Sequence, residues 1–343
     1  TDVSNFNFKD ISFDATADGN MGRGVYMSGK CVNIEFRNCH ILANPSSTSY
    51  DCYSFYKPSG SICDSIRLIG NLFSGGYYGF YFEGQSSGSG GYNTNIFIDS
   101  NIFEKAGNYS YYFYYTDLNS FSYNKIYPRN GSNNHHTYFY YTNHYNTVGN
   151  VWDYSKTNIE YAYNYFYYPQ YANFSGTGLI ANNEIILSSS ANEGYGMYIE
   201  NTNGTVKIYH NSIYDPGSSS YSRGIYAYCG NGIGTFEIIN NNIWSNGYPI
   251  YVTGTGVTVT SDYNNFYGTG SNIGYFNTDC QTLSDWSTAS NDVTSVNVAP
   301  QYLDRSESLE LVSATGLGCP QINPITTDKL GNTRNATTTM GCY

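Results

Sequence analysis

The chain has 343 residues, of which 40 are Tyr and only 12% are charged, about half of the usual ~25%. Its 15 basic and 26 acidic residues give a formal net charge of -11 at pH 7, which argues against nucleic acid or an anionic membrane as a partner. No apolar stretch approaches the ~18 residues of a membrane span, so direct membrane insertion is not expected.

A short motif recurs at steps of 23 to 34 residues along most of the chain. It consists of an apolar alternation, one or two Asn, an apolar residue and an aromatic one, and its clearest copy is 238–244. A fixed motif with a variable spacer indicates one structural unit per copy, with the length differences absorbed by loops. The anchor of each copy, three residues before the final aromatic or aliphatic one, is Asp10, Asn38, Gly70, Ser100, Asn124, Gly149, Asn183, Asn211, Asn241 and Asn264.

Asn suits this anchor for two reasons. Stacked side-chain amides can donate to and accept from the equivalent residue one unit away, which satisfies buried polar groups at a tight bend. Asn also tolerates the left-handed backbone that such a bend needs. We therefore expect an asparagine ladder at the bend.

A second column of aromatic residues follows the anchors, in runs such as 24–27, 79–82 and 196–199. Their period-two alternation predicts strands in which residues such as Val25 and Met27 point inward and the Tyr between them points outward. The predicted outward column is Tyr26, Tyr81, Tyr114, Tyr140, Tyr167, Tyr198, Tyr226 and Tyr251.

Two or three short strands per unit predict an all-β fold, a right-handed parallel β-helix (solenoid) of about ten coils with an irregular C-terminal cap. Leucine-rich and ankyrin repeats need helix-period patterns that are missing, and a propeller blade needs roughly 40 or more residues per repeat. We expect the parallel β-helix at 1–290. The segment 291–343 is expected to be a C-terminal cap, since the last coil exposes strand edge and core that must be covered.

The eight Cys residues give further register information. Cys31 and Cys63 head equivalent strands in successive units, and stacked coils place such residues roughly 4.8 Å apart, within disulfide range. Glu35 and Arg67 follow at the same step. We predict a Cys31–Cys63 bond and, with it, an oxidising compartment outside the cytoplasm. The sequence does not fix the remaining connectivity, for which proximity suggests Cys39 with Cys52, Cys319 with Cys342, and Cys229 with Cys280.

These repeats look like those of the pectate-lyase-like superfamily of parallel β-helix proteins. The tail at 299–304, 309–311, 328–334 and 340–343 resembles the closing segment of bacterial surface β-helix proteins of the choice-of-anchor type. That segment usually carries a Ser-Pro-Ala-Ile-Asp run, where this chain has Gly-Cys-Pro-Gln-Ile-Asn at 318–323. The resemblance implies secretion by a Gram-negative bacterium and attachment to the cell surface or to a larger fibre.

Catalytic groups do not gather in the sequence. A β-helix lyase needs a Lys or Arg base beside calcium-binding carboxylates, and a β-helix hydrolase needs a close Asp pair. Asp99, Lys105 and Asp117 come nearest to such a set, and we interpret them as scattered loop charges. No catalytic residue is therefore predicted.

Metal ligands are not predicted either. His135, His136 and His144 lack the partner spacing of a structural zinc site, so we interpret them as polar loop residues. The acidic turn at 14–20 could hold a structural calcium ion, but a plain turn is the preferred interpretation. No cofactor is expected.

The tyrosine column is the candidate contact surface, because a contiguous aromatic strip exceeds the few hundred Å2 of apolar patch that a monomer normally exposes. The sequence thus predicts a non-catalytic extracellular module with a structural or adhesive role at a cell surface or in a filament. Its tyrosine-rich faces would pack on neighbouring subunits by self-association, on glycans, or on both. A polysaccharide-degrading lyase or glycoside hydrolase is the alternative.

Overall fold

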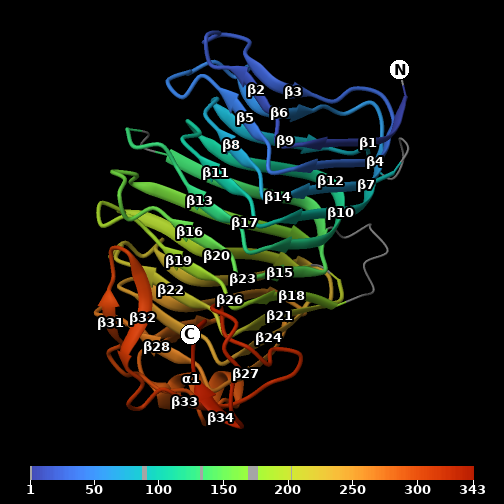
Figure 1. Cartoon of the computed structure of the whole chain (residues 1–343). Helices are drawn as coiled ribbons and strands as arrows, with labels where there is room; N and C mark the ends of the chain where they lie inside the picture. The colour runs from blue at the N-terminus through green and yellow to red at the C-terminus, as the bar shows by residue number, and fades with distance from the viewer. Residues whose placement is uncertain (1, 87–90, 132–133, 169–176, 202) are drawn as a thin grey trace.

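The computed structural model describes residues 2–86, 91–131, 134–168, 177–201 and 203–343, which form a parallel β-helix (Figure 1). The coils stack side by side, and each coil has three faces. Strands of one coil pair in parallel with the equivalent strands of the next. The predicted all-β solenoid is confirmed.

Three faces run along the solenoid, one strand per coil in each. The first face contains β1 (Val3–Lys9), β4 (Cys31–Arg37), β7 (Cys63–Ile69), β10 (Asn93–Asp99), the end of β12 (Tyr109–Ser122), β15 (Asn146–Val148), β18 (Thr177–Ala181), β21 (Thr205–Tyr209), β24 (Thr235–Ile239) and β27 (Thr258–Asp262). The second face contains β2 (Ser12–Ala15), β5 (His40–Ala43), β8 (Leu72–Ser74), β11 (Ile102–Glu104), β13 (Lys125–Tyr127), β16 (Val151–Asp153), β19 (Glu184–Ile186), β22 (Ser212–Asp215), β25 (Asn242–Ser245) and β28 (Asn265–Tyr267). The third face contains β3 (Arg23–Tyr26), β6 (Tyr53–Lys57), β9 (Tyr78–Glu83), the start of β12, β14 (Asn134–His144), β17 (Tyr161–Tyr168), β20 (Glu193–Asn201), β23 (Arg223–Asn231), β26 (Tyr248–Thr255) and β29 (Gly274–Phe276).

The interior is filled by apolar side chains that repeat with the coils. Phe55, Phe80, Phe113, Phe139 and Phe166 are fully buried, and the ring centroids of successive members lie 4.9–5.3 Å apart. Aromatic pairs at such distances contribute about 0.5–1.5 kcal/mol each beyond the burial of their area. The Phe rings therefore repeat along the core with about the same spacing as the paired strands of successive coils.

An asparagine ladder runs along the bend between the first and second faces. Its members are Asn71, Asn101, Asn124, Asn150, Asn183, Asn211, Asn241 and Asn264, all of them buried. The backbone N–H and Nδ2 of each Asn except the last, Asn264, donate to Oδ1 of the Asn one coil further on, at 2.9–3.1 Å. Nδ2 also donates to a carbonyl of the preceding coil, as Asn183 does to Thr147 at 2.9 Å.

The predicted anchors do not form one column in the structure. They fall at two neighbouring positions of the repeat, the ladder position and the residue before it. The residue with the left-handed backbone precedes the ladder position; in chain order it is Asp10, Asn38, Gly70, Ser100, Tyr123, Gly149, Asn182, His210, Asn240 and Tyr263. Five predicted anchors belong to this column: Asp10, Asn38, Gly70, Ser100 and Gly149. The chain turns at one residue and directs the amide of the next one inward, so the two properties fall on different residues.

Replacing a ladder residue should destabilise the solenoid strongly. Asn211→Ala removes the acceptor of the Asn183 N–H and Nδ2 groups, and each buried group left unpaired costs about 1–3 kcal/mol. We expect a loss of about 3 kcal/mol or more in the free energy of unfolding, measured by urea titration. The exposed Asn20→Ala should change it by no more than about 0.5 kcal/mol; equal effects of the two substitutions would contradict a supporting role for the ladder.

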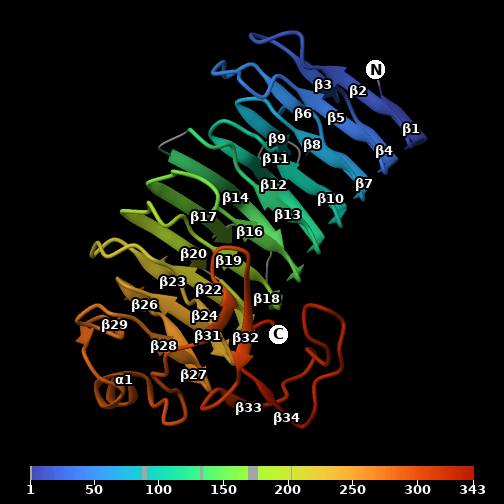
Figure 2. The ribbon, with the colours of Figure 1, turned by 60° about the vertical axis from the view of Figure 1, so that its left-hand side comes forward.

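The C-terminal end of the solenoid is closed by the short helix α1 (Leu283–Ser290), which follows β30 (Asp279–Cys280) (Figure 2). Trp286 of α1 is fully buried, and its ring centroid lies 5.3 Å from that of Phe266 in the last coils. The backbone N–H of Phe266 donates to the Val296 carbonyl at 2.9 Å. The helix covers the core, and the segment that follows it covers a strand edge through a parallel bridge between Val296 and Asn265.

Asp292 receives the last hydrogen bonds of the ladder. Asn264 donates through its backbone N–H to Ser295 Oγ at 2.8 Å and through Nδ2 to Ser261 Oγ at 3.1 Å. Both hydroxyls donate to Asp292 Oδ2 at 2.6 Å. Burial raises the pKa of Asp292, but these hydrogen bonds outweigh burial and the pKa is lowered overall, so the buried side chain is a carboxylate.

The rest of the tail folds back along the side of the later coils (Figure 2). It carries β31 (Gln301–Asp304), β32 (Ser308–Ser313), β33 (Gly318–Pro320) and β34 (Thr337–Thr339). Strand β32 contacts β19 and β22. The end of the solenoid is therefore covered mainly by α1, which lies before the expected boundary at 290/291, whereas most of 291–343 covers the side.

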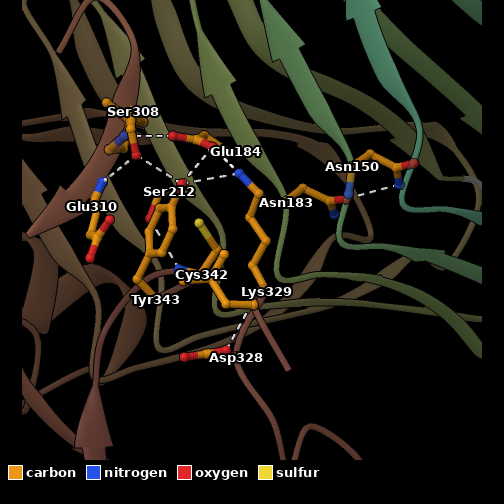
Figure 3. Close-up of polar contacts among 12 residues, drawn as sticks. Asn150, Asn183, Glu184, Ser212, Ser308, Glu310, Asp328, Lys329, Cys342 and Tyr343 are labelled. Atoms are coloured by element: carbon orange, nitrogen blue, oxygen red, sulfur yellow. Dashed lines mark hydrogen bonds and ion pairs between the residues drawn. The ribbon is translucent and has the colours of Figure 1, made fainter. Parts of the chain in front are cut away.

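A buried ion pair holds the tail against the solenoid (Figure 3). Glu184 of β19 is 2% exposed, and its carboxylate accepts hydrogen bonds from the Leu309 N–H at 2.5 Å and the Tyr343 hydroxyl at 2.8 Å. It also pairs with the Lys329 ammonium group. Three segments of the tail thus meet at one carboxylate.

Glu184→Ala should release the tail. It leaves the largely buried Lys329 without its partner, and breaking a buried ion pair in this way costs about 3–5 kcal/mol. We expect faster limited proteolysis within 299–343 and a lower unfolding midpoint. The control is Glu307→Ala, which removes an exposed ion pair to Lys156 worth at most about 1 kcal/mol. Unchanged proteolysis of the Glu184 variant would show that Glu184 does not hold the tail in place.

The first coil of the described residues is not covered in this way. Among the described residues, β1, β2 and β3 each pair with a strand on one side only. Their coil surrounds a hollow of about 410 Å3 lined mainly by apolar side chains, among them Val3, Phe8, Phe13 and Val25, and also by Cys31. The first coil thus exposes part of the solenoid core.

Candidate functional site: the tyrosine face

The outer surface of the third face, which we call the tyrosine face, is paved with phenol rings. Parallel pairing aligns one Tyr of each coil into a central column: Tyr26, Tyr56, Tyr81, Tyr112, Tyr138, Tyr165, Tyr198, Tyr226, Tyr251 and Tyr275. Successive ring centroids lie 4.2–5.7 Å apart. The inward neighbours, such as Val25 and Met27, are buried, which confirms the predicted strand phase.

Three predicted members stand in a neighbouring column. Tyr114 pairs with Glu83, and Tyr167 pairs with Glu200, with Tyr140 between them at ring distances of 5.2 and 5.1 Å. The prediction placed these residues two positions too far along their strands. The run 112–115 has an aromatic side chain at every position, so alternation alone does not reveal which Tyr continues the column.

A third column completes the tyrosine face on its other side. It was not predicted from the sequence, although Tyr or a cation recurs three residues before the central Tyr in most coils. Its members are Arg23, Tyr53, Tyr78, Tyr109, His136, Tyr163, Tyr195, Arg223 and Tyr248. The Arg223 guanidinium carbon lies 4.0 Å from the Tyr251 ring centroid and 4.7 Å from that of Tyr226, within the range of cation–π contacts.

The rings are half-buried rather than fully exposed, because each packs on its neighbours along the column. Tyr26 in the first coil has a neighbour on one side only and is 54% exposed. Burial raises the phenol pKa, to about 12 for Tyr78 and Tyr226. The tyrosine face therefore presents neutral hydroxyl groups at physiological pH.

Carboxylates border the rings. The Tyr81 hydroxyl donates to Glu83 at 2.8 Å, that of Tyr163 to Glu193 at 2.9 Å, and that of Tyr165 to Glu200 at 2.8 Å. A phenol that donates to a carboxylate keeps its oxygen lone pairs as acceptors. Burial raises the pKa of Glu200.

A shallow hollow of about 440 Å3 lies in the middle of the tyrosine face. It spans four coils, from Tyr112 through Tyr138 and Tyr165 to Tyr198, and His136 lines one side. The His136 ring is nearly parallel to that of Tyr163, at 7° and 5.3 Å. Burial lowers the His136 pKa to about 4, so the ring is neutral and can both donate and accept.

The interpretation of the histidines as loop residues is wrong. His135, His136 and His144 all lie in β14, with His135 and His144 fully buried. Burial lowers the pKa of His144 to about 3 and holds that of His135 well below its usual value. Within the described ranges, no group of three or more His, Cys, Asp or Glu residues is arranged to hold a metal ion.

The other candidate groups are dispersed. Asp99 and Asp117 lie on strands of the first face, where Asp99 accepts from Ser120 and Asp117 accepts from Asn143, both at 2.5 Å. Lys105 lies beyond β11 and pairs with its neighbour Glu104. Burial raises the pKa of both Asp side chains. In the turn at 14–20, the carboxylates accept hydrogen bonds from their own turns.

All eight Cys side chains are buried free thiols in the structure. Cys31 and Cys63 are register partners, as are Glu35 and Arg67, so the predicted register is confirmed and the disulfide itself stays a prediction. The other suggested pairs are not direct register partners. Cys39 lies between β4 and β5, whereas Cys52 precedes β6. Cys229 lies in β23 and Cys280 in β30. Cys319 is the strand partner of Thr338, and the backbone N–H of Cys342 donates to Ser212 Oγ.

Comparison of the chain with protein-family models, with curated proteins and with solved structures found no match. No helix in the described part of the chain is long and apolar enough to cross a membrane.

Because the rings support one another, truncating them should cost more than exposed positions usually do. Tyr198→Ser/Tyr226→Ser/Tyr251→Ser removes four successive ring contacts of the central column, each worth about 0.5–1.5 kcal/mol. We expect a lower midpoint of unfolding but a retained β-sheet spectrum in circular dichroism. The matched Phe triple variant keeps the rings and should unfold nearly as wild type; a Ser variant as stable as wild type would contradict the packing argument.

Proposed function

We propose that the protein is a non-catalytic extracellular module with a structural or adhesive role, and that its tyrosine face binds an uncharged glycan. The observation that carries the proposal is the continuous aromatic face with its central hollow. Aromatic rings and hydroxyl groups together suit sugars, which present apolar C–H surfaces and hydroxyl groups. The coil spacing of roughly 4.8 Å is also close to the length of one pyranose unit in an extended chain.

The charges of the tyrosine face favour an uncharged ligand. Glu83, Glu193 and Glu200 border the rings, and the chain has a net charge of -11, both of which repel an acidic polysaccharide. Arg223 is already engaged with Tyr195, which lines the hollow and to which Arg223 donates at 2.8 Å. A neutral chain meets neither repulsion nor an unpaired charge.

The location at a bacterial cell surface is part of this proposal. It is supported by the likeness of the repeats and tail to surface β-helix proteins of the pectate-lyase-like and choice-of-anchor types. The contacts of Glu184 hold the tail against the solenoid, which would protect this segment from proteases outside the cell.

Removing hydroxyl groups from the hollow should weaken glycan binding without unfolding the protein. We expect Tyr165→Phe/Tyr198→Phe to lower the affinity for neutral polysaccharides by about tenfold, since each hydrogen bond contributes about 0.5–1.5 kcal/mol. Affinity electrophoresis in gels containing xylan, mannan or soluble cellulose derivatives measures this, with polygalacturonate as the acidic comparison. The control is Tyr26→Phe/Tyr56→Phe, in the same column outside the hollow.

Three outcomes would contradict the proposal. Equal retardation of both Phe variants would remove the hollow as the site. In the second outcome, the wild-type protein shows no retardation in any gel and instead sediments faster as its concentration rises. If the Tyr198 substitution abolished that association, the partner would be a second copy of the chain. Release of reducing or unsaturated ends from any polysaccharide, with or without calcium, would show an enzyme.

A further inference from the structure

Two thiols and one ammonium group gather in the first coils, away from the tyrosine hollow. Cys31 and Cys63 are direct register partners at the start of β4 and β7, 4% and 1% exposed. Lys57, at the end of β6, is 0% exposed, and it interacts electrostatically with both thiols. All three belong to the first coils of the solenoid.

The two thiols differ in access. Cys31 lines the hollow of about 410 Å3 at the N-terminal end, and Cys63 does not. Cys63 lies one coil deeper, so a reagent that enters the hollow reaches Cys31 first. The geometry therefore distinguishes a more accessible thiol, Cys31, from a deeper one, Cys63.

Lys57 is a buried cation that needs an anion. Its ammonium group donates to the backbone carbonyls of Ser61 and Glu83, but no ion pair to a carboxylate joins it among the described residues. Burial of an unpaired charge is costly. A thiolate at the Cys31–Cys63 pair would add a negative charge to that of Glu83, which interacts with Lys57 electrostatically without forming an ion pair.

We propose that Cys31, Cys63 and Lys57 form a thiol–disulfide exchange site that opens into the N-terminal hollow and takes small-molecule disulfides. Cys31 is the attacking thiol, Cys63 is the resolving thiol, and Lys57 stabilises the thiolate. The predicted Cys31–Cys63 bond is then an exchangeable bond rather than an inert one.

The exchange balances in two steps. The Cys31 thiolate attacks one sulfur of a disulfide R–S–S–R, forming a mixed disulfide and releasing one RS−. Cys63 gives its proton to the RS− released in the first step and attacks the Cys31 sulfur, which forms the Cys31–Cys63 bond and releases the second RS−. The protein loses two electrons and the small disulfide gains them.

The electrostatics agree with these roles. Hydrogen bonding to the Cys63 thiol lowers the Cys31 pKa to about 7, with a further contribution from Lys57, whereas burial and Asp2 oppose it. The same hydrogen bond raises the pKa of Cys63. Burial lowers the Lys57 pKa, and the Cys63, Glu83 and Cys31 charges raise it again.

The test uses the reduced full chain. Alkylation by iodoacetamide, followed by mass spectrometry of peptides, should modify Cys31 selectively with a half-maximal rate near pH 7, rather than the ~8.5 of an ordinary thiol. The other seven Cys, each at most 2% exposed, are internal controls. Lys57→Met should move the midpoint up by about one pH unit or more, and Lys57→Arg should restore it.

Oxidised glutathione is the second probe. Wild type should end with a Cys31–Cys63 linkage, and Cys63→Ser should accumulate glutathione on Cys31. Alkylation of Cys31 as slow as that of Cys39, a midpoint near that of a free thiol, or glutathione attached first to Cys63 would each overturn the proposal. The wild-type profile and the Cys63→Ser product decide the question even if Lys57→Met does not fold.

Discussion

The asparagine ladder is the interaction on which the rest of the solenoid depends. A bend repeated in every coil buries backbone N–H and C=O groups that no neighbouring strand pairs, and each unpaired group is costly. From Asn71 to Asn264, the amide of one coil satisfies the donors of the coil before it. Coils of different lengths therefore keep one register at this bend, and loops elsewhere absorb the difference.

The tyrosine face follows from that register. Once the bends are aligned, the third-face strands must also align, and the phenols stack at 4.2–5.7 Å on the outside as the Phe rings stack at 4.9–5.3 Å on the inside. The outer rings thereby stabilise the fold and form a surface at the same time. The rings are partly buried by their neighbours, which leaves edges, hydroxyl groups and the central hollow for a ligand.

Local pattern was sufficient to predict the coil, the strand phase and the partners Cys31–Cys63 and Glu35–Arg67, because each depends on spacing within neighbouring units. It did not separate Tyr112 from Tyr114, since every residue there is aromatic. Local pattern also does not predict ion pairs: Glu35 is the strand partner of Arg67, but its carboxylate pairs with Arg37 at 2.8 Å. The tail is harder still, because its contacts, such as Glu184 with Lys329, join residues far apart in the chain that share no repeat.

The ladder has a direction with an electrostatic consequence. Along the ladder, each Asn carbonyl accepts from its N-terminal neighbour, and each Nδ2 before Asn264 donates one of its two hydrogens to the C-terminal neighbour. The side-chain dipoles therefore add head to tail, as peptide dipoles do in a helix. The positive end of this column lies at Asn264, where two serine hydroxyls lead to the Asp292 carboxylate. Asp292 thus compensates the dipole of a β-structure as an acidic residue compensates the N-terminus of a helix.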